Sequence, residues 1–225
     1  MKHNNAPISK YKLKKILRCF SLDFTATQTY KITGINRNTV NKYFNKVRQL
    51  IYHQQVYEMQ KLVGDVEVDE SYFGPRRIKG KSSKRGRGTS FKKVVFGIYE
   101  RDGGVYTSII RNCKKRTLHA VMTRKIDLNS TIYSDSWKGY NGLVDVGFDR
   151  HFRVNHNKDQ FSKRNGTHIN GIEAFWSFCK RRMSKFNGTK KNFSLHLKEC
   201  EWRWKKSSEV QYQKLLKFVN NLSKC

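Results

Sequence analysis

The chain has 225 residues, and 47 Lys and Arg against 17 Asp and Glu give a formal net charge of +30. This charge argues against an ordinary acidic enzyme for small anionic metabolites and predicts a polyanionic partner, either nucleic acid or an anionic membrane. No apolar run approaches the roughly 20 residues of a spanning helix, and the N-terminus lacks the apolar core of a signal peptide. We therefore expect a soluble, cytoplasmic, nucleoid-associated protein that binds nucleic acid, with no membrane and no small-molecule substrate as partner.

A folded core is expected, because apolar residues make up 37% of the chain and aromatic residues 13%, whereas a basic disordered tail would hold few of either. The five cysteines are scattered, and none belongs to a Cys-x-x-Cys pair. This spacing argues against a disulfide scaffold or a zinc ribbon and predicts reduced thiols.

Residues 9–60 are predicted to be helical, starting with an apolar stripe at helical spacing. Two further segments, 25–33 and 37–48, flank a short turn that contains Gly34, which is the pattern of a helix-turn-helix. Asn36 is a residue type suited to cap the second of these helices. The inward-facing apolar positions are expected to be Ile35, Val40, Phe44 and Val47.

The outward face of that second helix carries residue types that read DNA bases. Its members are Arg37, Asn38, Asn41, Lys42 and Asn45. Arg and Asn hydrogen-bond guanine and adenine edges in the major groove, so this face is a candidate for DNA recognition. The alternative is a plain helical hairpin with a solvated polar face, and Tyr30 stands where such motifs usually have a small residue.

From residue 62 the hydrophobic period changes to that of strands. Strands are predicted over 63–73, 94–99, 104–110, 130–134 and 151–155, with a hairpin turn at 102–104. Helices are predicted over 117–125 and 169–183, and one or two more within 193–222. Three strands, a helix, two strands and a helix is the order of a ribonuclease-H-like α/β domain, a mixed sheet flanked by helices. We expect a small all-α region at 1–60 and this domain at 62–225, C-terminal helices included.

A basic loop is predicted at 75–93, between the first two strands. Seven of the fourteen residues from 75 to 88 are basic and three are glycine, with no core-forming pattern. The candidate phosphate contacts are Arg76, Arg77, Lys79, Lys81, Lys84, Arg85, Arg87, Lys92 and Lys93. The segment therefore predicts an arm that orders on DNA, although a solvated loop without a dedicated role is the alternative.

The few acids are placed informatively. Four of the 17 fall between residues 65 and 70, Asp135 directly follows an apolar strand, and Glu173 lies inside an amphipathic helix. Phosphodiester chemistry uses carboxylates that gather divalent metal ions. Asp69, Asp135 and Glu173 lie on elements that could converge for this purpose. Lys180 follows Glu173 by two helical turns, on the same face, where a cation could hold a DNA phosphate next to Arg181.

Each of these residues also has a structural alternative. Asp69 could pair with a neighbouring Arg, and Asp135 could cap a following turn. Asn170 and Glu173 have the spacing of a capping box, and Lys180 could be an ordinary surface lysine.

Three motifs carry a resemblance to a known family: VDESYFG at 68–74, YSDSWKGY at 133–140 and HINGIEAFWSFCKRR at 168–182. With the basic loop, they resemble bacterial insertion-sequence DDE transposases of the insertion-sequence 1595 (ISXO-type) family, and within it the insertion sequence 1016 group. The resemblance covers roughly residues 62–206. Many relatives begin with a Cys-rich zinc-binding module, whereas this chain has only Cys19 before residue 113.

The resemblance implies a ribonuclease-H-like domain whose triad maps to Asp69, Asp135 and Glu173, with Lys180 as a fourth member. Some relatives have Asn in place of the third acid; Glu173 fits the Glu version, and nearby Asn170 is an alternative ligand. It also implies two Mg²⁺ ions, for which Mn²⁺ can substitute, and double-stranded DNA as substrate. The expected activity is cleavage at the terminal inverted repeats and strand transfer to target DNA. A dimer or larger assembly is expected, because two ends must be joined.

Three alternatives remain open on sequence alone. A non-catalytic regulator or ribosomal-type protein would explain the charge and the helix-turn-helix, but not three acids in triad order. A nuclease of the same fold would cut without strand transfer, and an inactive copy would do neither.

Overall fold

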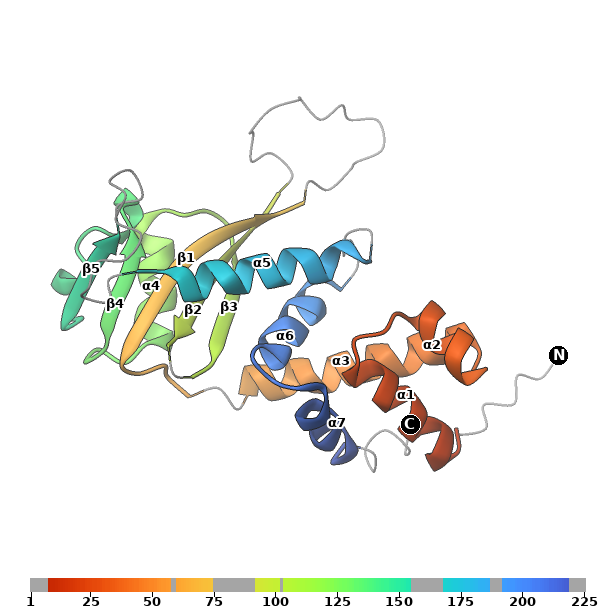
Figure 1. Cartoon of the computed structure of the whole chain (residues 1–225). Helices are drawn as coiled ribbons and strands as arrows, with labels where there is room; N and C mark the ends of the chain where they lie inside the picture. Colours follow the sequence, from red (N-terminus) through yellow and green to blue (C-terminus); the bar gives the residue numbers. More distant parts are fainter. Residues whose placement is uncertain are drawn as a thin grey trace, which may run out of the picture. The chain divides into compact units, whose positions relative to one another are not determined.

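The computed structural model describes residues 8–57, 60–74, 92–101, 103–154, 168–186 and 192–218. The chain divides into two compact units (Figure 1). A helical unit comprises Met1–Glu58 and Lys198–Cys225, and a unit built on a β-sheet comprises Met59–Leu197. None of the helices within the described ranges is long and apolar enough to cross a membrane.

The helical unit contains α1 (Lys10–Ser21), α2 (Ala26–Thr33), α3 (Arg37–Tyr57), the end of α6 (Phe193–Arg203) and α7 (Ser208–Leu216). The prediction of helices between residues 9 and 60 is therefore confirmed. Ser9 caps α1, and Thr25 and Gln28 form a capping box at the start of α2, so local side chains satisfy the first backbone N–H groups of each helix.

Helices α2 and α3 and the short turn between them lie where the helix-turn-helix prediction expects two helices and a turn. Gly34 ends α2 in the left-handed conformation, with φ +70°, and the Asn38 backbone N–H donates to Asn36 Oδ1 at 2.8 Å, as expected for an N-cap. Tyr30 is 49% exposed, so its size does not disturb the packing. The four predicted inward positions are buried, and the polar positions are exposed except for Asn45, which is half-buried.

The two C-terminal helices pack differently from the expectation that residues 62–225 form one domain. Trp202 of α6 and Leu215 of α7 lie in the same core as Leu13, Phe20 and other residues of α1 and α3. The apolar faces of α1 and α3 need a cover that the first 60 residues do not supply by themselves, and the end of the chain supplies it. The helical unit is thus built from both ends of the sequence.

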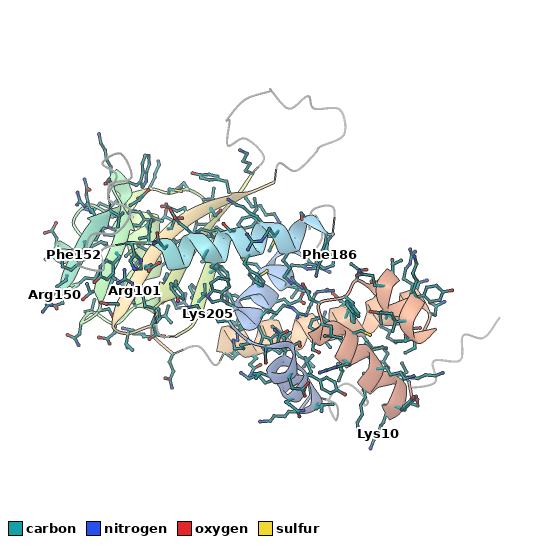
Figure 2. The ribbon with its side chains drawn as sticks, in the orientation of Figure 1. Lys10, Arg101, Arg150, Phe152, Phe186 and Lys205 are labelled. Carbon is teal, nitrogen blue, oxygen red and sulfur yellow. The ribbon has the colours of Figure 1, made fainter. Side chains whose placement is uncertain are left out.

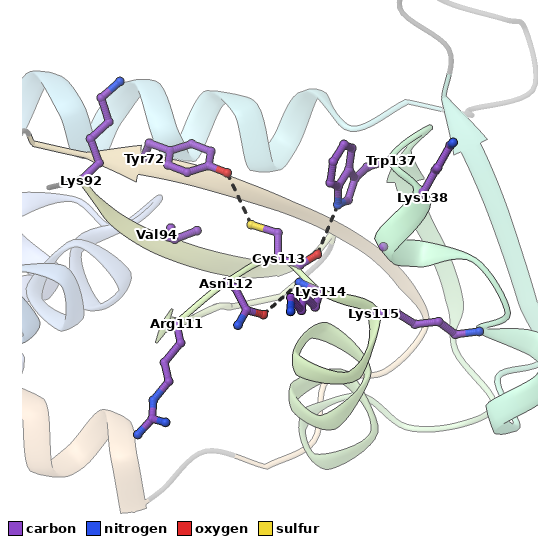
Figure 3. Close-up of a pocket in the computed structure, with 11 residues that line it drawn as sticks. Tyr72, Lys92, Val94, Arg111, Asn112, Cys113, Lys114, Lys115, Trp137 and Lys138 are labelled. Carbon is purple, nitrogen blue, oxygen red and sulfur yellow. Dashed lines mark hydrogen bonds between the residues drawn. The ribbon is translucent and has the colours of Figure 1, made fainter. Parts of the chain in front are cut away.

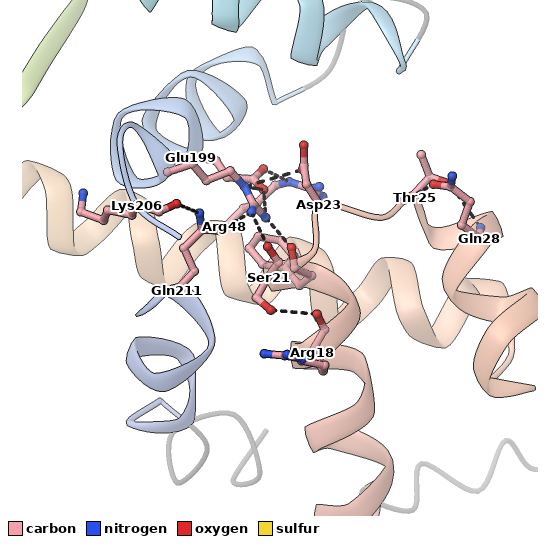
Figure 4. A network of polar contacts seen from close by, with 11 residues as sticks. Arg18, Ser21, Asp23, Thr25, Gln28, Arg48, Glu199, Lys206 and Gln211 are labelled. Atoms are coloured by element: carbon pink, nitrogen blue, oxygen red, sulfur yellow. Dashed lines mark hydrogen bonds and ion pairs between the residues drawn. The ribbon is translucent and has the colours of Figure 1, made fainter. Parts of the chain in front are cut away.

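Buried charges join these distant segments (Figure 4). The fully buried Glu199 carboxylate accepts from Arg48 Nε of α3 at 2.8 Å and from Arg203 Nε at 2.9 Å. Arg203 also donates to the Phe20 and Ser21 carbonyl oxygens and to Gln211 Oε1. Removing one side of such a buried pair leaves an uncompensated charge, which typically costs about 3–5 kcal/mol of stability.

The second unit has a five-stranded mixed sheet in the order β3-β2-β1-β4-β5. Its strands are β1 (Asp65–Phe73), β2 (Lys93–Glu100), β3 (Val105–Ile110), β4 (Thr131–Asp135) and β5 (Arg150–Val154). The first three pair antiparallel, whereas β4 runs parallel to both β1 and β5. With α4 (Lys115–Lys125) and α5 (Asn170–Ser184), this is the ribonuclease-H-like fold that the element order predicts.

The two faces of β1 contact two different helices, α4 and α5. Val66 and Val68 point to one face, where they share a core with Leu118 and Met122 of α4. Glu67 and Asp69 alternate with them, so they point to the other face, where both bond to α5. The alternation of side chains along a strand therefore determines which carboxylates of β1 interact with α5.

Parts of the earlier predictions lie outside the described residues. They include residue 102 of the expected hairpin turn and most of the basic loop, with all its expected phosphate contacts from Arg76 to Arg87. They also include residues 58–59, 155 and 219–222 of expected helices and strands, and Cys225. Lys92 and Lys93 are described, and Lys93 Nζ lies over the Phe193 ring at 4.5 Å from its centroid. Cys19, Cys113, Cys179 and Cys200 are free thiols, as expected.

Candidate active site

Two of the expected site residues are neighbours in the sheet. Val68 of β1 pairs with Ser134 of β4 in the parallel ladder, so Asp69 and Asp135 follow that pair by one residue each. Adjacent strands lie about 4.8 Å apart, which brings both carboxylates to one position on the sheet. Asp135 also makes the turn contact foreseen as its alternative role, since the Trp137 backbone N–H donates to its Oδ1 at 2.9 Å.

Helix α5 brings the third acid, Glu173, near enough to act electrostatically on Asp69. Its buried stripe contains the expected Ile172, Phe175, Trp176 and Cys179, and Glu173 and Lys180 lie on its exposed side. The Trp176 indole Nε1–H donates to Asp69 Oδ2 at 3.1 Å. The helix thus both covers the strand and orients the Asp69 carboxylate.

A glycine opposite Asp69 makes room for that indole. Gly97 of β2 pairs with Asp69 in the antiparallel ladder. A Cβ atom at position 97 would lie only 2.4 Å from the Trp176 ring and 2.9 Å from Ile172 Cδ1. Any larger residue would therefore push Trp176 away from the sheet and from the carboxylate that it holds.

The start of α5 is held by an acid whose role the sequence did not reveal, together with Arg101, which is labelled in Figure 2. Buried Glu67 accepts from the Ile172 backbone N–H at 2.9 Å and from Arg101 Nε at 3.0 Å. Arg101 in turn donates to the His168 carbonyl oxygen. The suspected capping box of Asn170 and Glu173 is wrong, because the N-cap residue is Ile169 and a carboxylate from β1 does the capping.

The carboxylates act on one another electrostatically. Burial raises the pKa of Asp69 to about 7, and the negative charges of Glu70, Asp135 and Glu173 add to the shift. Burial likewise raises the pKa of Glu70 to about 7, with a further contribution from Asp135 and an opposing one from the Tyr140 hydroxyl. The three acids of the expected triad are thus close enough for their charges to interact.

Glu70 is a member of this cluster to which the sequence analysis assigned no role. Its Oε1 atom and the Tyr140 hydroxyl are both buried, and the hydroxyl lies near enough to lower the pKa of Glu70. The available signal was the doublet of acids at 69 and 70. Side chains alternate along β1, so Asp69 and Glu70 point to opposite faces of the sheet. A strand period therefore predicts only one of these two acids on any one face.

The cluster has the chemistry of a divalent-cation site. Carboxylate oxygens are the ligands that Mg²⁺ and Mn²⁺ prefer, and half-buried carboxyl groups that repel one another fit a missing positive charge. Among the described residues, no three Asp, Glu, His or Cys side chains already lie close enough to form a metal cluster. The residues that could hold a cation here are Asp69, Asp135 and Glu173, with Glu70 beside them.

Cation binding at this site should depend on pH. Asp69 must release its proton to bind a cation, so below its pKa of about 7 the affinity for Mn²⁺ should fall by up to roughly tenfold per pH unit. Isothermal titration between about pH 5 and about pH 8 would measure this. Without a cation, the stability of the fold changes with pH in the opposite direction. The raised pKa of Asp69 stabilises the folded state at low pH, and this stabilisation is lost as the pH rises through about 7. An affinity for Mn²⁺ that does not change with pH would contradict the assignment of Asp69.

Others of the expected site residues lie on α5 or in the helical unit. Arg181 is exposed on α5, one residue after Lys180. Arg37, Asn38, Asn41 and Lys42 belong to the helical unit.

Comparison with known proteins points to one family. Residues 61–205 match the ISXO2-like transposase domain. A transposase-like protein of Haemophilus influenzae, itself uncharacterized, is 41% identical over 110 residues, which are 48% of this chain and 86% of that relative. Two crystal structures are similar at low identity, the Mos1 strand transfer complex (12%) and the Mos1 mariner paired end complex with Mn (11%). Both cover 100% of this chain and 80% of theirs with a TM-score of 0.37, too low to support a structural argument.

Proposed function

This chain belongs to the ISXO2-like transposase family. We therefore propose that it binds the ends of an insertion sequence and catalyses metal-dependent DNA cleavage and strand transfer. One observation carries the proposal more than any other. Asp69, Asp135 and Glu173 come from two neighbouring strands and the covering helix, and the charges of the latter two raise the pKa of the first.

The carboxylates would have distinct roles. Asp69 and Asp135 would hold the divalent ions, Mg²⁺ or Mn²⁺, and Glu173 would complete the second position. When bound, these ions supply activation of the attacking oxygen and stabilisation of the leaving oxygen. Trp176 and Glu67 would keep Asp69 and the first turn of α5 in place during the reaction.

The reaction has two successive displacements at phosphorus. In the first, a water oxygen bonds to phosphorus, the bond to the 3′-oxygen breaks, and a free 3′-hydroxyl results. In the second, that hydroxyl attacks a phosphodiester of the target DNA, and the bond to the displaced 3′-oxygen of the target breaks. No covalent protein intermediate is needed, and exposed Lys180 and Arg181 would hold the DNA backbone beside Glu173.

Recognition of the ends would fall to the helix-turn-helix. Because α1 and α3 share a core with α7, deletion of the first 60 residues would expose that core, and point substitutions are the cleaner test. Asn41→Ala should reduce the preference for end DNA over random duplex by roughly 5- to 150-fold, which is the contribution of one bidentate base contact. The affinity for random duplex should not change. Competition binding with labelled end DNA measures this, with Gln49→Ala, exposed two turns further along α3, as the control. An unchanged preference in Asn41→Ala and in Arg37→Ala would rule out recognition by this face.

Joining separates the proposed activity from its alternatives. A transposase should cut end DNA and link the new 3′-hydroxyl to a second duplex, a nuclease of the same fold should only cut, and a regulator should only bind. Joined products in a Mg²⁺-containing assay with two labelled duplexes are therefore the expected result. Because two ends must be brought together, we also expect the active species to be a dimer or larger.

A further inference from the structure

An open groove of about 610 Å³ lies beside the carboxylate cluster in the sheet-containing unit (Figure 3). It is bordered by the end of β1, the start of β2, the segment between β3 and α4, and the turn that follows β4. Among the described residues that line it, none is acidic and five are basic: Lys92, Arg111, Lys114, Lys115 and Lys138. We call this feature the basic groove, and its charge fits a polyanion.

Two aromatic rings are exposed in the basic groove. Trp137 is 52% exposed and Tyr72 is 40% exposed, although large aromatic side chains are usually buried. Both are fixed by Cys113: the Trp137 indole Nε1–H donates to its carbonyl oxygen at 3.3 Å, and the Tyr72 hydroxyl lies 3.5 Å from its Sγ. Figure 3 shows the two rings on either side of this cysteine. The rings are therefore held in place while remaining open to solvent.

A buried glycine permits this arrangement. A Cβ atom at Gly139 would lie 2.8 Å from the Trp137 indole and 2.9 Å from the Cys113 carbonyl oxygen. Trp137 also donates its backbone N–H to Asp135 Oδ1, so the exposed ring and a carboxylate of the cluster belong to one turn. On β1, Tyr72 follows Glu70 by two residues and so lies on the same face of the strand, whereas Asp69 points to the other face. The basic groove thus begins where the carboxylate cluster ends.

We propose that the basic groove binds unpaired nucleotides of the DNA strand next to the cleaved phosphodiester, with a base stacked on Trp137 and its phosphates on Lys114 and Lys138. This inference rests on the proposed function for the identity of the strand. Cations alone would suit a duplex backbone equally well. Exposed rings favour unpaired DNA, because bases in a duplex already stack on each other and only an unpaired base offers its face to a side chain.

Substitution of the ring tests the proposal. Trp137→Ala should weaken binding of an oligothymidylate of about 12 nucleotides by roughly 5- to 150-fold, the effect of losing one stacked base, and Trp137→Phe should retain most of the affinity. Affinity for a duplex of the same length should not change in either variant. Fluorescence anisotropy at one fixed low salt concentration measures both. Phe152→Ala, which removes a similarly exposed ring outside the basic groove, is the matched control.

A direct signal comes from the indole itself. Of the four tryptophans, Trp176 and Trp202 are buried and Trp204 is half-buried in the helical unit. The quenching by oligothymidylate that disappears in Trp137→Phe is therefore the part that comes from Trp137, and we expect it to be the larger part. Lys138→Ala should weaken binding of the same oligonucleotide, whereas Lys61→Ala, an exposed lysine outside the basic groove, should not. Gly139→Ala should reproduce the loss seen with Trp137→Ala, because the added methyl group displaces the ring.

The outcomes separate this proposal from the proposed function. If wild-type protein cuts and joins end DNA but Trp137→Ala binds oligothymidylate as well as wild type, the basic groove does not stack bases and the transposase assignment stands. If Lys138→Ala weakens single-stranded and duplex binding equally and Trp137→Ala weakens neither, the groove follows a duplex backbone and the proposal is wrong. If no cleavage occurs but Trp137 is quenched and required, the groove is supported and the proposed function fails.

Discussion

Replacing Asp69 by asparagine is expected to slow cleavage of end DNA by on the order of 10³-fold or more, with little change in DNA affinity. Asparagine keeps the shape and can still accept the Trp176 indole N–H, but it loses the charge that holds a divalent ion. Single-turnover cleavage in Mg²⁺ and DNA binding in Ca²⁺ would measure the two effects separately. The thermal stability of this variant at about pH 8 should not fall, because ionised Asp69 is repelled by its neighbours above its pKa of about 7.

The same loss is expected for Asp135→Asn and Glu173→Gln, since all three carboxylates would serve one site. Asp149→Asn is the matched control. It removes one exposed carboxylate next to the start of β5, whereas Asp135 is the last residue of the neighbouring parallel strand β4. Full cleavage activity in any one of the three variants would remove that residue from the triad. Loss of cleavage together with a lowered melting temperature would instead indicate a folding defect.

Affinity for duplex DNA should fall by roughly 10³–10⁵-fold between about 50 and about 200 mM salt, if about 6–10 phosphates are contacted. The reason is that each phosphate neutralised by Lys or Arg releases condensed counterions, and a chain with a net charge of +30 has many cations available for this. Fluorescence anisotropy with a duplex of fixed length over a salt series gives the slope of log affinity against log salt. That slope counts the contacts without assuming where they lie.

Two controls make the salt series informative. Asp69→Asn should have the same slope as wild type, because it changes no phosphate contact. Substitution of Arg181 by alanine should reduce the slope by about one contact. A flat salt response would show that the positive charge serves another purpose than binding the DNA backbone.

Local periodicity determined the order of helices and strands, because a period of 3.6 or 2 is set by which side chains must be buried along each element. The same applies to the inward face of α3 and to the stripe of α5 that packs on the sheet. The scarcity of acids in so basic a chain pointed to Asp69, Asp135 and Glu173, and the element order predicted that they would converge. For these features, no contact between distant residues had to be known.

Contacts between distant residues were decided only by the tertiary structure. Glu67 caps a helix that begins 103 residues later, at Asn170, and α7 covers a core begun by α1. The Trp176 indole can hydrogen-bond Asp69 only because Gly97, on β2, leaves space for the ring. The exposure of Trp137 above the basic groove depends in the same way on Cys113 and Gly139. Sequence patterns indicate which side chains are buried, whereas the partner that each side chain contacts depends on how whole helices and strands pack. That packing also places the basic groove beside the carboxylates.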